Sequence, residues 1–189
     1  MAGMTSTNTA LPLHPGRWAL DTSHSSIGFT IRHLGVSKVR GRFQRFDVDV
    51  VIGETLAETT VNATVDLASV DTGNPDRDAH VRSADLLDVE RRPTMTYRST
   101  AITEGRDRWL VDGDLTIGDV TRPVRFEVEL GGIEEFPGGP RHAGFEATGE
   151  LRRKEFGVDL ALPPGVNTVA LGDVVKLELD VQLLEPSAP

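Results

Sequence analysis

The sequence predicts an all-β domain of about eight antiparallel strands, and three observations favour this class. Apolar and polar residues alternate with a period of two through most of the chain after Trp18, as they do in strands that bury one face. Most links between the alternating segments are too short for the crossovers that parallel strands need. A helix signal is found in one segment, which begins at Asn74.

Each predicted strand has its own inward face. The alternating segments are residues 27–33, 39–52, 61–67, 95–101, 109–117, 124–130, 143–151 and 175–183. In 39–52 the phase changes between Phe43 and Phe46, which predicts a β-bulge near Gln44 and Arg45. Such a bulge bends a strand, as barrels require. The alternation itself is compatible with a sandwich or a barrel.

The helix signal is a capping sequence. Asn74-Pro75-Asp76 is typical of a helix start, and apolar residues recur in the stretch that follows. We expect one or two short helices over about residues 75–89, packed on an edge or over an end of the sheet.

Length and composition indicate a single domain with a flexible leader. The chain has 189 residues, enough for one sizeable core. Residues 1–16 are rich in Thr, Ser, Ala and Pro and predict a flexible leader, with the domain over residues 17–185. The leader lacks the basic start and apolar run of a secretory signal, so the expected location is cytoplasmic. No stretch approaches the roughly 18 apolar residues of a membrane span, so no integral membrane association is expected.

Charge and residue usage exclude several classes of function. The chain has 20 Lys and Arg against 29 Asp and Glu, a net charge of −9, which argues against a nucleic-acid binder and against simple electrostatic docking on an anionic membrane. The absence of cysteine excludes disulfides, thiol catalysis and Cys-ligated metals. The five histidines lack ligand spacing to one another, so no metal site is predicted.

Small residues share the predicted inward faces with large aromatic ones. Ala63, Gly113, Ala143, Ala147 and Gly149 all fall on inward phases. A barrel of eight strands is just wide enough to be filled by side chains or to hold one ligand. The small residues therefore indicate either a ligand cavity or a core that tapers.

Two polar features have two interpretations each. His33 continues the inward face of 27–33, where a lone histidine is either a hydrogen-bonded core residue or a base or ligand. Lys38, Arg40 and Arg42 share one phase of the next strand. This basic stripe is either a solvated outer face or a rim that meets an anionic head group or a membrane surface.

Arg153 and Glu155 continue the inward phase of 143–151. If the strand runs on without a bulge, both side chains point inward, where charge is costly unless paired. We expect either a mutual ion pair or a polar contact to a bound molecule.

An ordered series of motifs resembles the YceI-like family over Gly16 to about Leu184. The opening motif is Trp18-x-Leu20-Asp21-x-x-His24-Ser25-x-Ile27-x-Phe29-x-Ile31-x-His33, followed by Val39-x-Gly41-x-Phe43. The central motifs are Asp71-Thr72-Gly73, Arg77-Asp78-x-His80, Arg82-Ser83-x-Asp85, Pro93 and Tyr97-x-Ser99, with Tyr97 where the family more often has Phe. The closing motifs are Gly113-x-Leu115-Thr116-Ile117, Val120-Thr121, Arg153-x-Glu155-Phe156-Gly157, with Glu155 for Asp, and Gly172-Asp173-x-Val175.

The resemblance implies a lipocalin-like, extended eight-stranded antiparallel barrel whose tunnel binds a polyisoprenoid chain, often that of an isoprenoid quinone. Many members of the family carry a secretion signal and act in the periplasm, and this chain departs from them at its amino terminus.

Strand phase predicts which side chains such a ligand would contact. We expect contacts to the tail from inward apolar residues and polar contacts from three others near them. The predicted binding residues are Phe29, Ile31, His33, Phe43, Met95, Tyr97, Trp109, Phe126, Phe145, Arg153 and Phe156, of which His33, Tyr97 and Arg153 are the polar ones. No catalytic residue and no cofactor is predicted, apart from the bound lipid itself.

Three functions are compatible with these residues. The first is non-catalytic binding, storage or transport of a prenyl-chain lipid, with no nucleic-acid partner and with a homodimer left open. The second is a scavenger that accepts many hydrophobic small molecules. The third is an enzyme that acts on an amphipathic substrate through His33 or His80, although the sequence lacks a nucleophile with a correctly spaced base.

Overall fold

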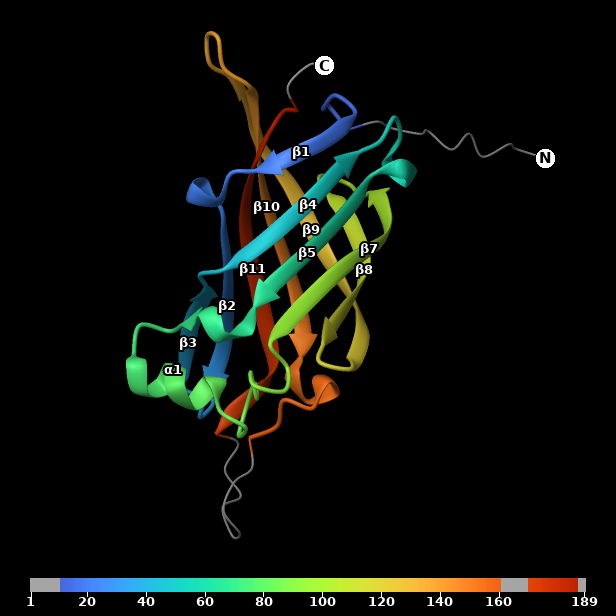
Figure 1. Cartoon of the computed structure of the whole chain (residues 1–189). Helices are drawn as coiled ribbons and strands as arrows, with labels where there is room; N and C mark the ends of the chain where they lie inside the picture. Colours follow the sequence, from blue (N-terminus) through green and yellow to red (C-terminus); the bar gives the residue numbers. More distant parts are fainter. Residues whose placement is uncertain (1–10, 161–169, 187–189) are drawn as a thin grey trace, which may run out of the picture.

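The computed structural model describes residues 11–160 and 170–186, and these form a closed antiparallel β-barrel (Figure 1). The strands are β1 Gly16–Leu20, β2 Ser26–His33, β3 Ser37–Phe43, β4 Phe46–Ile52, β5 Thr60–Asp66, β6 Val70–Asp71, β7 Thr94–Glu104, β8 Trp109–Ile117, β9 Val120–Glu135, β10 Arg141–Arg152 and β11 Leu171–Leu184. The helices are α1 Pro75–Arg82 and the short 3₁₀ turns η1 Thr22–His24, η2 Leu56–Glu58, η3 Leu67–Ser69 and η4 Arg153–Phe156.

These segments make eight barrel strands, because three of the eight are each interrupted once. β1 continues into β2, β3 into β4 and β5 into β6, and each composite strand pairs antiparallel with the next. β11 closes the barrel because it pairs with β2 through Leu179↔Ile27 and with β1 through Leu183↔Leu20. The prediction of an eight-stranded antiparallel barrel is confirmed, and the closure decides between barrel and sandwich.

The predicted irregularity at Gln44 and Arg45 separates β3 from β4. The backbone N–H of Gln44 donates to the carbonyl of Ser69 at 3.1 Å, and that of Arg45 donates to Oγ of Ser69 at 3.0 Å. Ser69 lies in η3, which interrupts the neighbouring composite strand. The two interruptions therefore satisfy each other's backbone groups while both strands bend.

A hydrogen-bonded corner around Asp21 separates β1 from β2. The Asp21 carboxylate accepts hydrogen bonds from Oγ of Ser23 at 2.6 Å and from the amide of Gln182 at 3.0 Å, and Nδ1 of His24 lies 2.8 Å from it. The bonds to Ser23 and then to His24 lower the pKa of Asp21 well below its usual range. Because Gln182 lies on β11, the corner holds both halves of the interrupted strand against one partner.

The helix α1 begins as predicted and ends sooner. Oδ1 of Asn74 accepts a hydrogen bond from the N–H of Arg77 at 3.0 Å, which caps the helix, and Pro75 occupies its first position. The helix ends at Arg82, and residues 83–91 form turns in place of a second helix. Figure 1 shows α1 beside β3 at one end of the barrel, which we call the lower end.

The part of the chain that packs on the barrel starts before the predicted boundary at residue 17. β1 begins at Gly16, and Leu13 before it is buried in the core. The carbonyl of His14 accepts a hydrogen bond from the indole of Trp18 at 2.9 Å. The rest of the predicted leader, residues 1–10, lies outside the described residues.

Candidate functional site

Two cavities follow one another along the barrel axis. The upper cavity has a volume of about 140 Å³ and the lower cavity about 500 Å³. The upper one is lined by Leu11, Ile27, Val48, Val50, Ile52, Thr59, Val61, Ala63, Val65, Met95, Thr96, Tyr97, Ile102, Trp109, Val111, Leu115, Phe126, Val128, Phe145, Ala147, Leu177, Leu179, Val181 and Leu183. The lower one is lined by Phe29, Ile31, His33, Val39, Phe43, Leu67, Val70, Thr72, Asp76, Arg77, His80, Val81, Leu86, Leu87, Met95, Ile117, Leu151, Arg153, Val158, Leu160, Ala170, Leu171, Val175 and Leu177.

Met95 and Leu177 line both cavities and form the waist between them. Met95 lies on β7 and Leu177 on β11, which are four barrel strands apart and therefore on opposite walls. Both side chains are buried. Since a methionine side chain is unbranched and adapts to irregular space, the waist is formed on one side by a flexible group.

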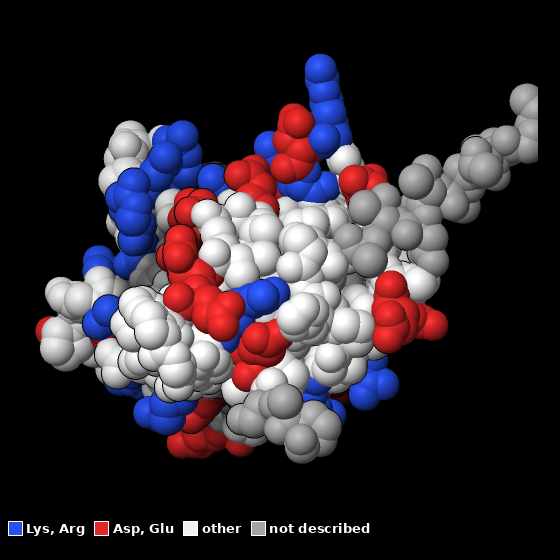
Figure 2. All heavy atoms as spheres, turned by 90° about the horizontal axis from the view of Figure 1, so that it is seen from above, with Lys and Arg blue, Asp and Glu red and all other residues white. Residues whose placement is uncertain are grey.

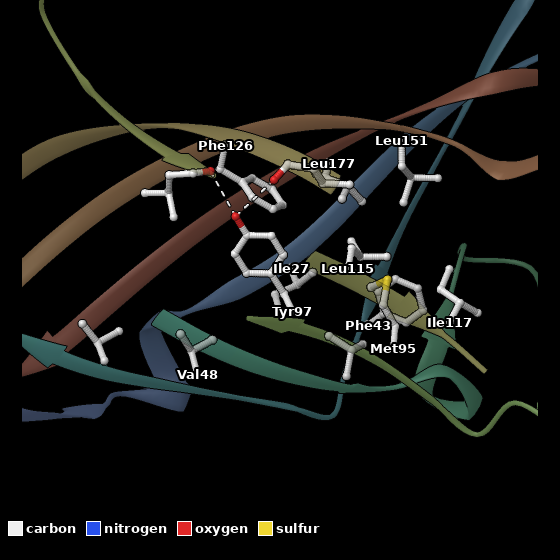
Figure 3. Close-up of a cluster of buried hydrophobic side chains, with 14 of the residues drawn as sticks. Ile27, Phe43, Val48, Met95, Tyr97, Leu115, Ile117, Phe126, Leu151 and Leu177 are labelled. Carbon is white, nitrogen blue, oxygen red and sulfur yellow. Dashed lines mark hydrogen bonds between the residues drawn. The ribbon is translucent and has the colours of Figure 1, made fainter. Parts of the chain in front are cut away.

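The upper cavity has a mostly aliphatic and aromatic lining, and the hydroxyl of its one tyrosine is turned into the wall. The hydroxyl of Tyr97 has two carbonyl acceptors, that of Val111 at 3.0 Å and that of Val124 at 3.2 Å (Figure 3). Burial raises the pKa of Tyr97, and the carboxylates of Asp112 and Asp114 raise it further. The neutral ring packs edge-on against Phe126, with 5.1 Å between the centroids.

The inward glycines do not create the cavities. A Cβ atom on Gly113 would lie 2.4 Å from Cζ of Tyr97, and one on Gly149 would lie 2.8 Å from a ring carbon of Phe126. The aromatic ring of the neighbouring strand therefore covers each glycine, and neither glycine lines a cavity. Of the two interpretations of the small inward residues, the packed core holds at these two positions and at Ala143, which is fully buried and lines neither cavity, whereas Ala63 and Ala147 do line the upper cavity.

Polar side chains gather at the lower cavity, on α1 and beside it. Nη2 and Nε of Arg77 donate to the carbonyl and the hydroxyl of Thr72, both at 2.8 Å. Nε2 of His80 lies 3.2 Å from the carboxylate of Asp85. Asp76 and His33 also line the cavity and are exposed. The lower cavity can therefore offer both charge signs and imidazole groups to a polar ligand group.

Arg153 is buried at the wall of the lower cavity, with 5% of its surface exposed. Its guanidinium donates to the carbonyls of Val158 at 2.8 Å, Gly172 at 2.8 Å and Leu171 at 2.9 Å, and it lies 3.4 Å from the carboxylate of Asp159. These partners use most of its donors. Its main role is therefore to hold the segment after η4 against the start of β11.

Of the two expectations for Arg153 and Glu155, the mutual ion pair is wrong. β10 ends at Arg152, and η4 follows, so the inward phase of the strand does not reach Glu155, which is exposed. Phe156, at the end of η4, is buried to 1% exposure and lines neither cavity. It packs in the core in place of contacting the bore, because the 3₁₀ turn redirects its side chain.

Ionic groups are distributed unevenly over the outside of the barrel. Figure 2, viewed from above, shows uncharged residues over much of the upper end, with Asp and Glu side chains among them. Lys and Arg side chains gather on the side where β2, β3 and α1 stand in Figure 1. Within residues 11–160 and 170–186, no three His, Asp or Glu side chains converge as a metal site.

Comparison with known proteins shows which family this barrel belongs to. The family described as the YceI-like domain matches residues 18–183. The chain belongs to the YceI-like family. It is 39% identical to Protein YceI of Escherichia coli O157:H7 over 149 residues, which are 78% of each chain.

Solved YceI-like structures share the fold. The Campylobacter jejuni YCEI protein is 27% identical, with a TM-score of 0.70 over 89% of this chain and 98% of that one. A polyisoprenoid binding domain from Saccharophagus degradans is 14% identical, with a TM-score of 0.61 over 92% of this chain and 100% of that one. At that identity the likeness concerns the fold alone.

The structure of this YceI-like chain brings ten of the eleven predicted binding residues to the two cavities. Tyr97, Trp109, Phe126 and Phe145 line the upper one, Phe29, Ile31, His33, Phe43 and Arg153 line the lower one, and Met95 lines both. Sequence reasoning missed the aliphatic wall formed by β4 and β5 and the polar groups of α1. The alternation in β4 could have indicated the first. A helix over an end of the sheet was expected, but no signal in the sequence indicated that its polar groups would line a cavity.

Proposed function

We propose that this protein binds a long polyisoprenoid lipid, such as an isoprenoid quinone, in its bore, and stores or carries it without catalysis. The observation that carries the proposal is the pair of cavities that follow one another along the barrel and share the waist of Met95 and Leu177. Pockets that enclose small ligands have volumes of roughly 300–1,000 Å³ and mostly apolar linings. The larger cavity falls in that range.

The energetics favour long chains over short ones. Each buried CH₂ group contributes about 0.8 kcal/mol, so 15 carbons contribute about 12 kcal/mol before costs. Association costs on the order of 4–15 kcal/mol. Affinity should therefore increase with the number of prenyl units until the bore is filled.

The distribution of polar groups along the barrel axis favours one orientation of the ligand in the bore. Apart from Thr59 and Thr96, the upper cavity is lined by apolar residues and the Tyr97 ring, which suits the end of a hydrocarbon tail. His33, Asp76, Arg77 and His80 line the lower cavity, which suits a quinone or other polar head group. The tail would then pass the waist and end above it.

Two observations favour this function over the alternatives. The narrow upper cavity accommodates a slender chain better than a bulky ring, which argues against a scavenger of many compounds. Among the described residues the ring of His80 bonds Asp85, and no hydroxyl nucleophile bonds its ring, so a nucleophile–base pair for catalysis is not assembled there.

Relatives support the proposal without deciding the ligand. Membership of the YceI-like family and the likeness to a domain described as polyisoprenoid binding both agree with a lipid-filled barrel. No helix among the described residues is long and apolar enough to cross a membrane. The cytoplasmic location and the homodimer stay predictions.

The test is organic extraction of the purified protein followed by mass spectrometry. We expect a prenyl lipid near one equivalent per chain from a host rich in isoprenoid quinones. The variant His33→Gln should keep the lipid, since an imidazole at the cavity mouth contributes little to burial of the tail. Recovery of detergent alone, or of no lipid, would contradict the proposal.

A further inference from the structure

The turn between β2 and β3 exposes apolar side chains at the lower end. Leu34 and Val36 are 47% and 83% exposed, and Val174 at the start of β11 is 40% exposed. Phe136, at the opposite end of the barrel, is the remaining exposed large hydrophobic residue among those described. A cluster of exposed apolar residues at one end of a protein marks an interaction site more often than isolated apolar residues do.

The conformation of the turn does not explain why it is apolar. Leu34 has a φ of 52°, in the left-handed region that favours Gly, Asn or Asp over leucine. Its backbone N–H donates to the carbonyl of Ala170 at 3.0 Å, which fixes the turn. An asparagine would suit this backbone better, so the leucine side chain adds apolar surface at a local conformational cost.

Unpaired cations flank the same turn. Arg32 faces Lys38 across the β2–β3 ladder, and Arg40 follows on the same side. Among the described residues these three form no ion pair, whereas Arg42, one step further, lies 3.2 Å from Asp71. We call Arg32, Leu34, Val36, Lys38 and Arg40 the docking hairpin.

The inner face of the docking hairpin borders the lower cavity. His33 and Val39 alternate with Arg32, Lys38 and Arg40 along β2 and β3, and both line that cavity. A surface bound to the outer face would therefore lie next to the wider end of the bore.

We propose that the docking hairpin binds the surface of an anionic lipid bilayer. Leu34 and Val36 enter the head-group region while Arg32, Lys38 and Arg40 contact lipid phosphates. The net charge of −9 does not prevent this, because salt screens charges more than about 8 Å away. Such docking would let a lipid move between bilayer and bore without leaving an apolar environment.

The charge part of the test uses sedimentation with vesicles of phosphatidylcholine, alone or mixed with phosphatidylglycerol. We expect binding to the anionic vesicles that weakens as salt increases. Lys38→Glu with Arg40→Glu should reduce it at least ten-fold, since each cation near the surface contributes about five-fold. The control Arg98→Glu with Arg106→Glu makes the same change in net charge at exposed positions on β7 and its following turn, and should keep most of the binding.

The apolar part of the test uses Leu34→Asn with Val36→Thr. Asparagine suits the left-handed backbone and threonine matches the shape of valine, so the fold should survive, as thermal unfolding would verify. Binding should fall at least three-fold with no change in charge, while Phe136→Thr at the other end should leave it unchanged.

The vesicle experiment tests the docking hairpin separately from the proposed lipid binding in the bore. The amount of lipid extracted per chain from the purified hairpin variants should remain close to the amount from the parent chain. Absence of binding to anionic vesicles, or equal binding by parent and hairpin variants, would overturn the proposal. Self-association through the hairpin or capture by an acidic protein, without vesicle binding, would overturn it too.

Discussion

The two cavities differ because their walls are built differently. Around the upper cavity the wall is made mainly of paired strands, and alternation brings aliphatic and aromatic side chains inward. Around the lower cavity β6 pairs with β3 and not with β7, so α1, η3, η4 and the turns after α1 complete the wall. Strand pairing thus gives a narrow apolar space, whereas the non-strand wall gives a wider one with polar groups.

Filling the lower cavity should have the largest effect on the ligand. Val39→Trp places a large ring on its wall, so we expect prenyl lipid binding to fall at least 100-fold by titration with a fluorescent prenyl quinone. Thr30→Trp, on the outer face of β2, is the matched control. Equal loss in both variants, or in neither, would show that the lower cavity does not hold the ligand.

Loss of the buried guanidinium should destabilise the lower wall. Arg153→Met leaves three backbone carbonyls without their donor, which costs about 3 kcal/mol of unfolding free energy. Arg152→Met removes an exposed cation 3.4 Å from Asp173 and should cost at most about 0.5 kcal/mol. Urea unfolding measures both, and similar values for the two variants would refute the role given to Arg153.

Filling the upper cavity should change the preferred length of the ligand. Ala147→Trp occupies the space above the waist, so long prenyl chains should lose about ten-fold in affinity while short ones change little. Thr148→Trp puts the same ring on the exposed outer face one residue away. A uniform loss at all chain lengths would mean that the tail does not pass Met95.

The smallest expected effect concerns the hydroxyl of Tyr97 in the upper wall. Tyr97→Phe leaves two carbonyls without this donor and should cost about 1 kcal/mol. The folded-state pKa of Tyr97 is raised above its ordinary value of 10.0, so its stabilising contribution is complete below about pH 10 and falls as pH rises further. The Phe variant should lack that part of the alkaline decrease in a pH series of unfolding experiments, and an unchanged decrease would contradict this account.

The sequence predicted strand phase well because a buried face imposes alternation locally. Phe29, Phe126 and Phe145 reached the bore for that reason. Phase failed where the regular strand stopped, as at Phe156, since a 3₁₀ turn redirects side chains with no strong local signal. At Gly113 the inward phase is correct, but phase could not predict that the ring of Tyr97 from the neighbouring strand fills the space beside it.

The sequence alone determined the antiparallel strands, the cap of α1 at Asn74 and the irregularity at Gln44, because these depend on residues close together in the chain. The tertiary structure decided the closure of β11 on β1, the waist of Met95 and Leu177, and the polar groups that α1 brings to the lower cavity. These features join residues far apart in the chain, so packing and hydrogen bonding across the barrel fix them, and local pattern does not.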